Sequence, residues 1–144
     1  MPRVTIELPE YFPFSTEISV RVSDVNYAGH LGNDSVLSLA HEARIRFLAS
    51  HGFSEFDAGG AGMVMSDAAV VYKTQAFQGE RLRVDVAVAD FTRVGCDVYF
   101  RMVDISSGRD VAHVKTGIVF FDFATSTLVR TPAVFREKVS NATK

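Results

Sequence analysis

A single stretch of this chain has the periodicity of a long helix, and that constrains the fold more than any other feature of the sequence. From about Ser35 to His51 apolar side chains recur every three or four residues, and Gly52 predicts where the helix ends. The apolar stripe is formed by Val36, Ala40, Ala43 and Phe47, widened by Leu37, Leu39 and Leu48. So wide a stripe cannot remain in solvent, and we expect a sheet to wrap around this helix.

Five other segments alternate with the period of β-strands. One, residues 15–22, precedes the helix, and the others cover residues 63–73, 81–90, 96–104 and 111–123. The last four are separated by FQGE, FTRVG and SSGR, which are hairpin-sized connections that make successive strands antiparallel neighbours. The sequence therefore predicts an α+β fold, with one long central helix wrapped by an antiparallel sheet of about five strands.

Composition limits the class of protein. A chain of 144 residues with 47% hydrophobic content suits one domain covering residues 1–144. Fifteen Lys and Arg against seventeen Asp and Glu, without a basic run, argue against a nucleic-acid partner. Cys96 is the only cysteine, and the start MPRVTIELPE is too polar for a signal peptide, so we expect a cytoplasmic protein. No apolar run approaches the roughly 20 residues of a membrane span, so no membrane association is expected.

The densest polar cluster lies between the first strand and the helix. Within eleven residues, around Gly29 and Gly32, the chain places Asp24, Asn26, His30, Asn33 and Asp34. The first amides of a helix lack intrahelical acceptors and carry the positive end of its dipole, so they attract an oxyanion or a polarised carbonyl. We therefore predict that the functional site lies at this junction.

Three segments resemble the hot-dog fold thioesterases of the 4-hydroxybenzoyl-CoA thioesterase type. They are SDVNYAGHLGN at 23–33, HEAR at 41–44 and VVYK at 70–73, and the order of elements is similar from Phe14 to about Arg130. The resemblance implies hydrolysis of an acyl thioester of coenzyme A or acyl carrier protein, by a homodimer or homotetramer that pairs sheets edge to edge. Coenzyme A would enter as part of the substrate, and no separate cofactor is expected.

The turn departs from the family at the usual catalytic aspartate, which is Asn26 here. An amide cannot act as a base, but it can donate a hydrogen bond to the thioester oxygen. His30 is then the candidate general base, since histidine has an ordinary pKa of about 6.5 and similar plant acyl-carrier thioesterases have a histidine at the matching place. Asp34, four residues later, is expected to orient the imidazole, and the backbone amide of Asn33 is a candidate oxyanion donor.

Two arginines extend the candidate site. Arg44 lies on the apolar side of the helix and needs a partner. Polyketide hot-dog thioesterases that lack the acid resemble this chain in having a turn asparagine and a helix arginine, which implies oxyanion stabilisation. The alternative is a buried structural arginine tied to the partner subunit or to a carboxylate such as Asp67. Arg93 matches a basic stretch that contacts coenzyme A phosphates in relatives. Glu42 and Arg46, at i,i+4 spacing, are expected to form a solvated surface pair.

Several residues also have a purely structural interpretation. Asn26 and Asp24 are common turn residues, Asp34 is a common helix-capping residue, and His30 can be a turn histidine without chemistry. For Asp24 we favour the structural interpretation, in which it accepts backbone amides. The other histidines, His41, His51 and His113, are scattered without the spacing of metal ligands, so no metal site is expected.

Two further functions remain open. R-specific enoyl-CoA hydratases share the hot-dog fold and use a DxNPxH turn, but the string DVNYAGH has Tyr27 in place of proline and one more residue before His30. A non-catalytic acyl-CoA-binding protein that has lost the acid is the other alternative. Assays for free thiol and for loss of a conjugated double bond separate these functions.

Overall fold

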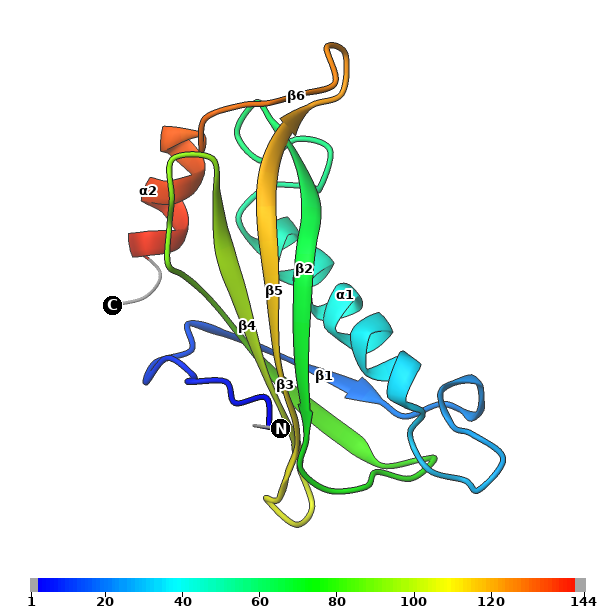
Figure 1. Cartoon of the computed structure of the whole chain (residues 1–144). Coiled ribbons are helices and arrows are strands. Elements are labelled where there is room, and N and C mark those ends of the chain that lie inside the picture. The colour runs from blue at the N-terminus through cyan, green and yellow to red at the C-terminus, as the bar shows by residue number, and fades with distance from the viewer. Residues whose placement is uncertain (1–2, 142–144) are drawn as a thin grey trace.

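The computed structural model describes residues 3–141 and contains one sheet, one long helix and one short helix (Figure 1). The long helix is α1 (Asn33–Ser50) and the short one is α2 (Ala133–Asn141). A single 3-10 turn, η1 (Val22–Asp24), precedes α1. The strands are β1 (Phe14–Ser19), β2 (Gly62–Tyr72), β3 (Arg81–Ala89), β4 (Gly95–Asp104), β5 (Asp110–Asp122) and β6 (Thr127–Leu128).

All strand pairs are antiparallel, as predicted, and the predicted hairpins join β3 to β4 and β4 to β5. The predicted pairing of residues 63–73 with residues 81–90 is wrong, because β2 pairs with β5 and the connection, residues 73–80, crosses to the other side of the sheet. The order across the sheet is β1-β3-β4-β5-β2, and β6 pairs with the end of β5. The sheet thus has six strands instead of about five, because the two-residue β6 is too short to give an alternating pattern. The long strand β2 pairs only with β5, so its other edge is open. Along this edge Val64, Met65 and Ala68 are exposed.

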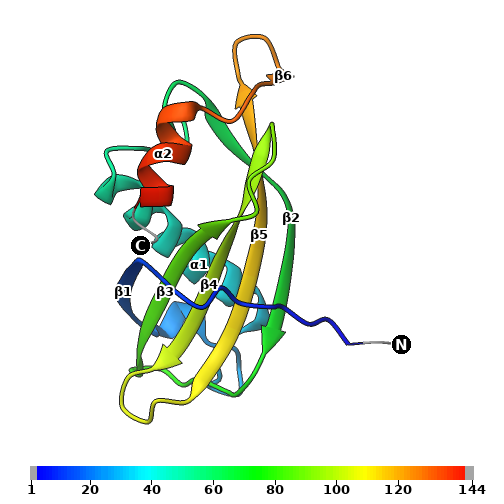
Figure 2. The same ribbon diagram turned by 90° about the vertical axis from the view of Figure 1, so that its left-hand side faces the viewer.

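The two faces of the sheet are covered differently. On the face opposite α1, the N-terminal residues 3–13 run across the strands (Figure 2). Near the start of the chain, residues 3–6 border a cavity with β2 and His113 of β5. Further along, the guanidinium carbon of Arg101 lies 5.0 Å from the centroid of the Phe12 ring. Within residues 3–141, neither helix is long and apolar enough to cross a lipid bilayer.

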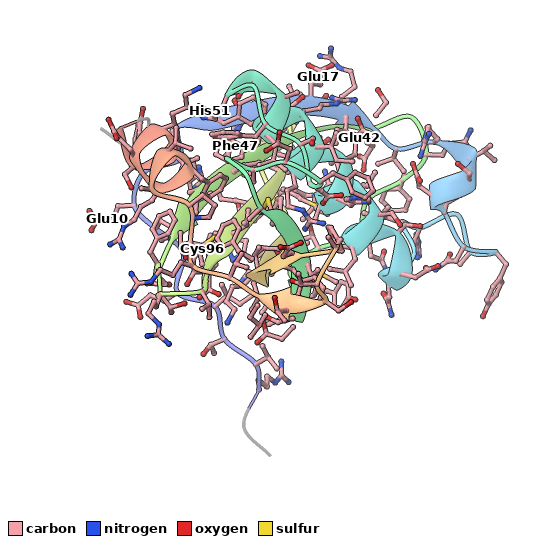
Figure 3. All side chains as sticks on the ribbon, turned by 90° about the horizontal axis from the view of Figure 1, so that it is seen from above. Glu10, Glu17, Glu42, Phe47, His51 and Cys96 are labelled. Atoms are coloured by element: carbon pink, nitrogen blue, oxygen red, sulfur yellow. The ribbon has the colours of Figure 1, made fainter. Side chains whose placement is uncertain are left out.

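The hydrophobic core lies between α1 and the curved inner face of the sheet. The predicted stripe of α1 is buried there, and Ala43 and Phe47 are at most 1% exposed. Opposite them lie the inward-facing side chains of the central strands, including Leu82, Val84, Phe100, Met102 and Val114. Viewed from above, Phe47 and Cys96 point into the interior and Glu10 and Glu17 lie at the periphery (Figure 3). The predicted wrapping of the helix by the sheet is confirmed.

The first strand is shorter than the expected residues 15–22. It ends at Ser19, and Val22, expected on the buried side, is 69% exposed in η1. Asp24 causes this change of direction: its buried carboxylate accepts a hydrogen bond from the amide of Arg21 at 2.8 Å. The prediction that Asp24 caps the turn by accepting backbone amides is therefore confirmed, and this local bond overrides the strand periodicity.

Helix α2 is the main element that the strand pattern did not predict. Its Phe135 and Val139 are buried, and the Phe135 ring packs against Phe53 and Phe120, with ring centroids 5.3 Å away in each pair. The signals were present, because Pro132 precedes the helix and the two buried residues have i,i+4 spacing. A nine-residue helix, however, offers only two such positions.

Candidate active site

The turn before α1 is closed by Asn26. Its side-chain Oδ1 accepts hydrogen bonds from the backbone N–H groups of Ala28 at 3.0 Å and His30 at 3.2 Å. Its own backbone N–H donates to the carbonyl of His30 at 2.8 Å. Because both side-chain partners are donors, the amide oxygen must face them, and the Nδ2 group points away. Among residues 3–141 that Nδ2 has no acceptor, so Asn26 shapes the turn with one atom and keeps two N–H donors available.

The N-terminus of α1 lacks a side-chain cap. Gly32 is the N-cap residue and can provide none, so Asp34 is not the cap but lies in the first turn. Within the described part of the chain, the backbone N–H groups of Asn33 and Asp34 have no hydrogen-bond acceptor, whereas the N–H of Ser35 donates to the Gly32 carbonyl at 3.0 Å. The result is a pair of unsatisfied donors at the positive end of an 18-residue helix.

His30 precedes Asn33 by three residues in the chain. The half-buried imidazole packs edge-on against Phe77, with 5.0 Å between ring centroids, and neither ring nitrogen has a hydrogen-bond partner among residues 3–141. Asp34, expected to orient the imidazole, makes no hydrogen bond to it here. The ring is instead positioned by its packing on Phe77 and by the backbone bonds that Asn26 makes.

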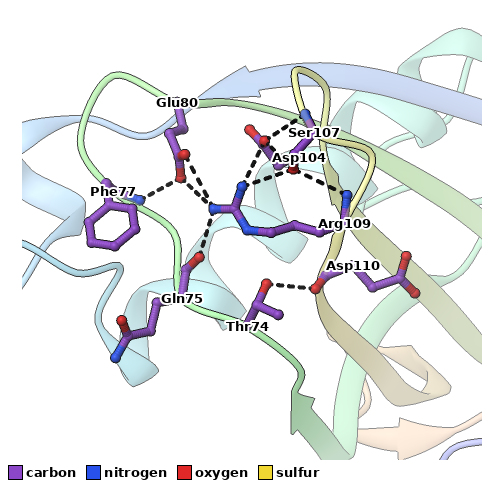
Figure 4. A network of polar contacts seen from close by, with 8 residues as sticks. All are labelled: Thr74, Gln75, Phe77, Glu80, Asp104, Ser107, Arg109 and Asp110. Atoms are coloured by element: carbon purple, nitrogen blue, oxygen red, sulfur yellow. Dashed lines mark hydrogen bonds and ion pairs between the residues drawn. The ribbon is translucent and has the colours of Figure 1, made fainter.

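A polar network holds the loop against which the turn packs (Figure 4). The N–H of Leu31 donates to the carbonyl of Ala76 at 2.7 Å, so residues 73–80 support the turn directly. That loop is fixed by the guanidinium of Arg109, which donates to the Gln75 carbonyl at 2.8 Å and forms ion pairs with Glu80 and Asp104. The sequence does not predict this network, because Arg109 is 29 residues from Glu80 and nothing local marks the pair.

Arg44 lies in a second cluster. Its side chain is 9% exposed, and its Nε donates to Glu55 at 2.9 Å, while Nε2 of His41 lies 3.0 Å from the other oxygen of that carboxylate. Burial disfavours the charged form of Glu55, but the hydrogen bonds from His41 and Arg44 outweigh it, so the pKa of Glu55 is lowered. The suggestion that Asp67 pairs with Arg44 is wrong, because the carboxylate comes from the glycine-rich loop after α1.

The two clusters are separate within one chain. Arg44 follows Asn33 by eleven residues, which places it about 16 Å further along the helix axis. It therefore does not join Asn26 and His30 around a single carbonyl group in the same chain.

The expected surface pair of Glu42 and Arg46 has a further role. Arg46 pairs with Glu42 at 2.8 Å, but it also donates to Thr16 Oγ1 and to the Glu17 carbonyl. It thereby ties α1 to β1 and is more than a solvated surface pair.

Arg93 and Cys96 lie near the far end of the sheet. Arg93 is exposed in the β3–β4 hairpin beside α2, at the opposite end of the molecule from the N-terminus of α1 (Figure 1). Burial raises the pKa of the Cys96 thiol to about 12, so this cysteine is not a nucleophile at neutral pH. Within residues 3–141, no three or more His, Cys, Asp or Glu side chains are grouped to hold a metal ion.

Two cavities lie between α1 and β2. The first, about 220 Å³, borders the N-terminus of α1 and is lined by Leu31, Asn33, Val36, Tyr72–Ala76 and Val111. The second, about 320 Å³, lies further along the helix, where α1 faces Met65 of β2 and Thr116 of β5. The hydroxyl of Tyr72 donates to the Asn33 carbonyl at 3.2 Å and links the two elements at the first cavity. One cavity thus borders the N-terminus of α1, and a second lies further along the same helix.

Similar proteins share this architecture. Over 89% of this chain and 96% of the other, the structure is similar to a 1,4-dihydroxy-2-naphthoyl-CoA thioesterase from Synechocystis, with 19% identity and a TM-score of 0.81. A thioesterase from Thermus thermophilus, solved with coenzyme A and zinc, is 22% identical over 93% and 97% of the two chains, with a TM-score of 0.79. A thioesterase superfamily protein from Jannaschia sp. CCS1 has a TM-score of 0.82 at 16% identity, covering 93% and 85%.

These likenesses establish the hot-dog fold. No curated protein matches the sequence. The model of the thioesterase-like superfamily matches residues 20–139, which include the turn, α1, every strand except β1, and most of α2. The chain therefore belongs to the thioesterase-like superfamily.

Proposed function

We propose that this protein hydrolyses acyl-coenzyme A thioesters at the junction of the 24–32 turn and α1. The observation that carries the proposal is the uncapped N-terminus of α1, where the amides of Asn33 and Asp34 have no acceptor within residues 3–141. His30, three residues before Asn33, has ring nitrogens that are likewise unpaired in this part of the chain. Hydrolysis of a thioester builds negative charge on the carbonyl oxygen, and preorganised donors aimed at that charge supply the largest part of such catalysis. An oxyanion at the helix N-terminus is also favoured by the helix dipole.

Four residues at the junction of the turn and α1 have roles in this reaction. The substrate carbonyl oxygen accepts hydrogen bonds from the Asn33 and Asp34 amides and from Nδ2 of Asn26. His30 removes a proton from a water molecule whose oxygen attacks the carbonyl carbon. When the carbon–sulfur bond breaks, His30 returns the proton to the departing thiolate, and the products are a free acid and coenzyme A thiol. Asp34 contributes its backbone amide to this scheme, in place of the imidazole contact that the sequence suggested.

Coenzyme A is the preferred carrier in this proposal. The Synechocystis protein is named for a CoA substrate, and the Thermus thermophilus protein was solved with coenzyme A. Arg93 is exposed, and its guanidinium, which has no partner among residues 3–141, is suited to a phosphate. It lies far from the turn of its own chain, so we assign it to the substrate that binds at the turn of a partner subunit.

The function is tested with three sets of compounds. Saturated acyl-CoAs are expected to release free thiol at a rate proportional to the concentration of the protein. The 2-enoyl-CoAs should keep their conjugated double bond. The same acyl groups on acyl carrier protein should react more slowly. Loss of the double bond without thiol release would make the protein a hydratase, although the fully exposed Tyr27, at the place of the hydratase proline, disfavours that reading. Binding of acyl-CoA without either reaction would make it a non-catalytic acyl-CoA-binding protein.

We also propose a homodimer in which the open edge of β2 pairs with β2 of a second copy. The outer edge of this eleven-residue strand, with exposed Val64 and Met65, has no strand partner among residues 3–141 and is a natural site for such pairing. Because the pairing is antiparallel about a twofold axis, it turns the partner's α1 N-terminus toward the end of the sheet that carries Arg93. A homotetramer would add a second interface to this dimer.

The dimer has a direct test. Light scattering at micromolar concentration is expected to give twice the chain mass of 15.8 kDa, or four times for a tetramer. Ala68→Lys places like charges at the paired edges and should shift the protein toward the monomer. Ala133→Lys, at an exposed alanine of α2, is the matched control and should leave the mass unchanged. A monomeric wild-type protein would contradict the proposal.

A further inference from the structure

The second cavity between α1 and β2 contains polar groups that the proposed reaction does not use. Its lining combines apolar Leu37 and Met65 with Ser38, His41, Arg44 and Thr116. It lies on the same side of α1 as the first cavity, because Asn33 of the first cavity and Leu37 of the second have i,i+4 spacing. An acyl group that starts at the helix N-terminus therefore passes apolar side chains before it reaches this polar end.

Thr116 is an unpaired hydroxyl in this cavity. It lies on the helix-facing side of β5 and is 1% exposed, and its Oγ1 has no hydrogen-bond partner among residues 3–141. A buried hydroxyl left without a partner costs about 1–3 kcal/mol, whereas valine would fill the same space without that cost. The hydroxyl therefore points to a partner that enters the cavity.

Arg44 provides further unused donors beside Thr116. A guanidinium has five N–H donors, and Arg44 uses only the one on Nε, for Glu55. Within the described part of the chain, its Nη1 and Nη2 have no acceptor, although the side chain is nine-tenths buried. Two adjacent guanidinium nitrogens match the two oxygens of a carboxylate.

We propose that the acyl group of the substrate carries a carboxylate remote from the thioester, and that Arg44 and Thr116 bind this carboxylate. The inference rests on the proposed hydrolysis, because it takes the α1 N-terminus as the position of the thioester carbonyl. Asn33 and Arg44 lie about 16 Å apart along the helix, and helix side chains lean toward the N-terminus, which shortens the gap. A dicarboxylic or carboxyaryl acyl group of medium length bridges it, and its apolar middle packs against Val36 and Leu37.

The test compares two substrates that differ only at the remote end. Octanedioyl-CoA ends in a carboxylate, and 8-methylnonanoyl-CoA has the same chain ending in an isopropyl group of similar shape. Wild-type protein is expected to have a kcat/KM at least about tenfold higher for octanedioyl-CoA, since a hydrogen bond to a charged group contributes that much. Thr116→Val should reduce this ratio by about three- to tenfold, and Arg44→Met should abolish it. Equal kcat/KM for the two substrates in the wild-type protein would overturn the inference.

A stability measurement separates binding from a structural role. Thr116→Val should unfold at the same temperature as wild type or higher, because it removes an unpaired hydroxyl without changing shape. Thr127→Val, at an exposed threonine of β6, is the matched control and should leave the substrate ratio unchanged. A lower unfolding temperature for Thr116→Val would show that the hydroxyl is already paired in the folded protein and would contradict the inference.

The same pair of compounds distinguishes the two proposals. If neither is hydrolysed, the proposed function fails, and titration calorimetry then measures binding alone. Tighter binding of octanedioyl-CoA, lost in Thr116→Val, would still support the carboxylate site. Equal binding of both compounds would overturn the inference independently of hydrolysis.

Discussion

Replacing His30 by alanine is expected to lower kcat on a good acyl-CoA substrate by about 100- to 10,000-fold, the usual contribution of a general base. The imidazole precedes the free α1 amides by three residues, and its ring nitrogens have no hydrogen-bond partner within residues 3–141. Steady-state kinetics with a thiol-release assay measures this loss.

The His30 variant needs a control for folding and for loss of any histidine. His30 packs on Phe77 but makes no side-chain hydrogen bond, so thermal unfolding of His30→Ala should remain close to that of wild type. His113→Ala removes a histidine of β5 that faces away from α1 and should keep near-native turnover. Near-native turnover of His30→Ala itself, on a substrate that wild type hydrolyses well, would show that the base has been wrongly assigned.

Asn26→Ala is expected to lower kcat by about 100- to 1,000-fold, the cost of losing one oxyanion donor. The change removes Nδ2, which we assign to the substrate oxygen. It also removes Oδ1, the acceptor for the N–H groups of Ala28 and His30. Kinetics at saturating substrate, measured together with thermal unfolding, record both effects.

Asn26→Asp separates the two roles of that side chain. One carboxylate oxygen can accept the same two backbone N–H groups, so the turn should keep its shape. The variant loses the Nδ2 donor but gains a carboxylate that can act as a base, and we expect it to exceed Asn26→Ala in turnover. If Asn26→Asp hydrolyses acyl-CoA and wild type does not, the natural protein is an acyl-CoA-binding protein.

Periodicity was enough to predict most of the fold. The stripe from Val36 to Leu48 and the alternating strands record which side of each element is buried, so α1 and the long antiparallel strands follow from them. The sequence does not predict elements in which the periodic pattern is short or is overridden by a local hydrogen bond. The hydrogen bond of Asp24 ends β1 before Val22, and α2 depends on two buried residues, Phe135 and Val139.

The candidate site was only partly predictable, because a sequence shows which residues are neighbours along the chain but not which distant residues come into contact. The polar turn was visible, since Asn26, His30 and Asn33 are neighbours along the chain. Long-range partners were not visible: Glu55 reaches Arg44 from a loop without regular structure, and Phe77 reaches His30 from the other side of β2. The unpaired Oγ1 of Thr116 is likewise a property of packing, because threonine is an ordinary strand residue.

Gly32 places a limit on how far this protein can be stabilised. A designer seeking heat resistance would put serine, threonine or aspartate at this N-cap, a change that usually contributes about 0.5–2 kcal/mol. Such a side chain would occupy the amides assigned to the thioester oxygen, and its Cβ would lie 2.8 Å from Oδ1 of Asp34. At this position thermal tolerance and turnover are opposed, so mutational libraries selected only for stability will tend to lose activity through Gly32.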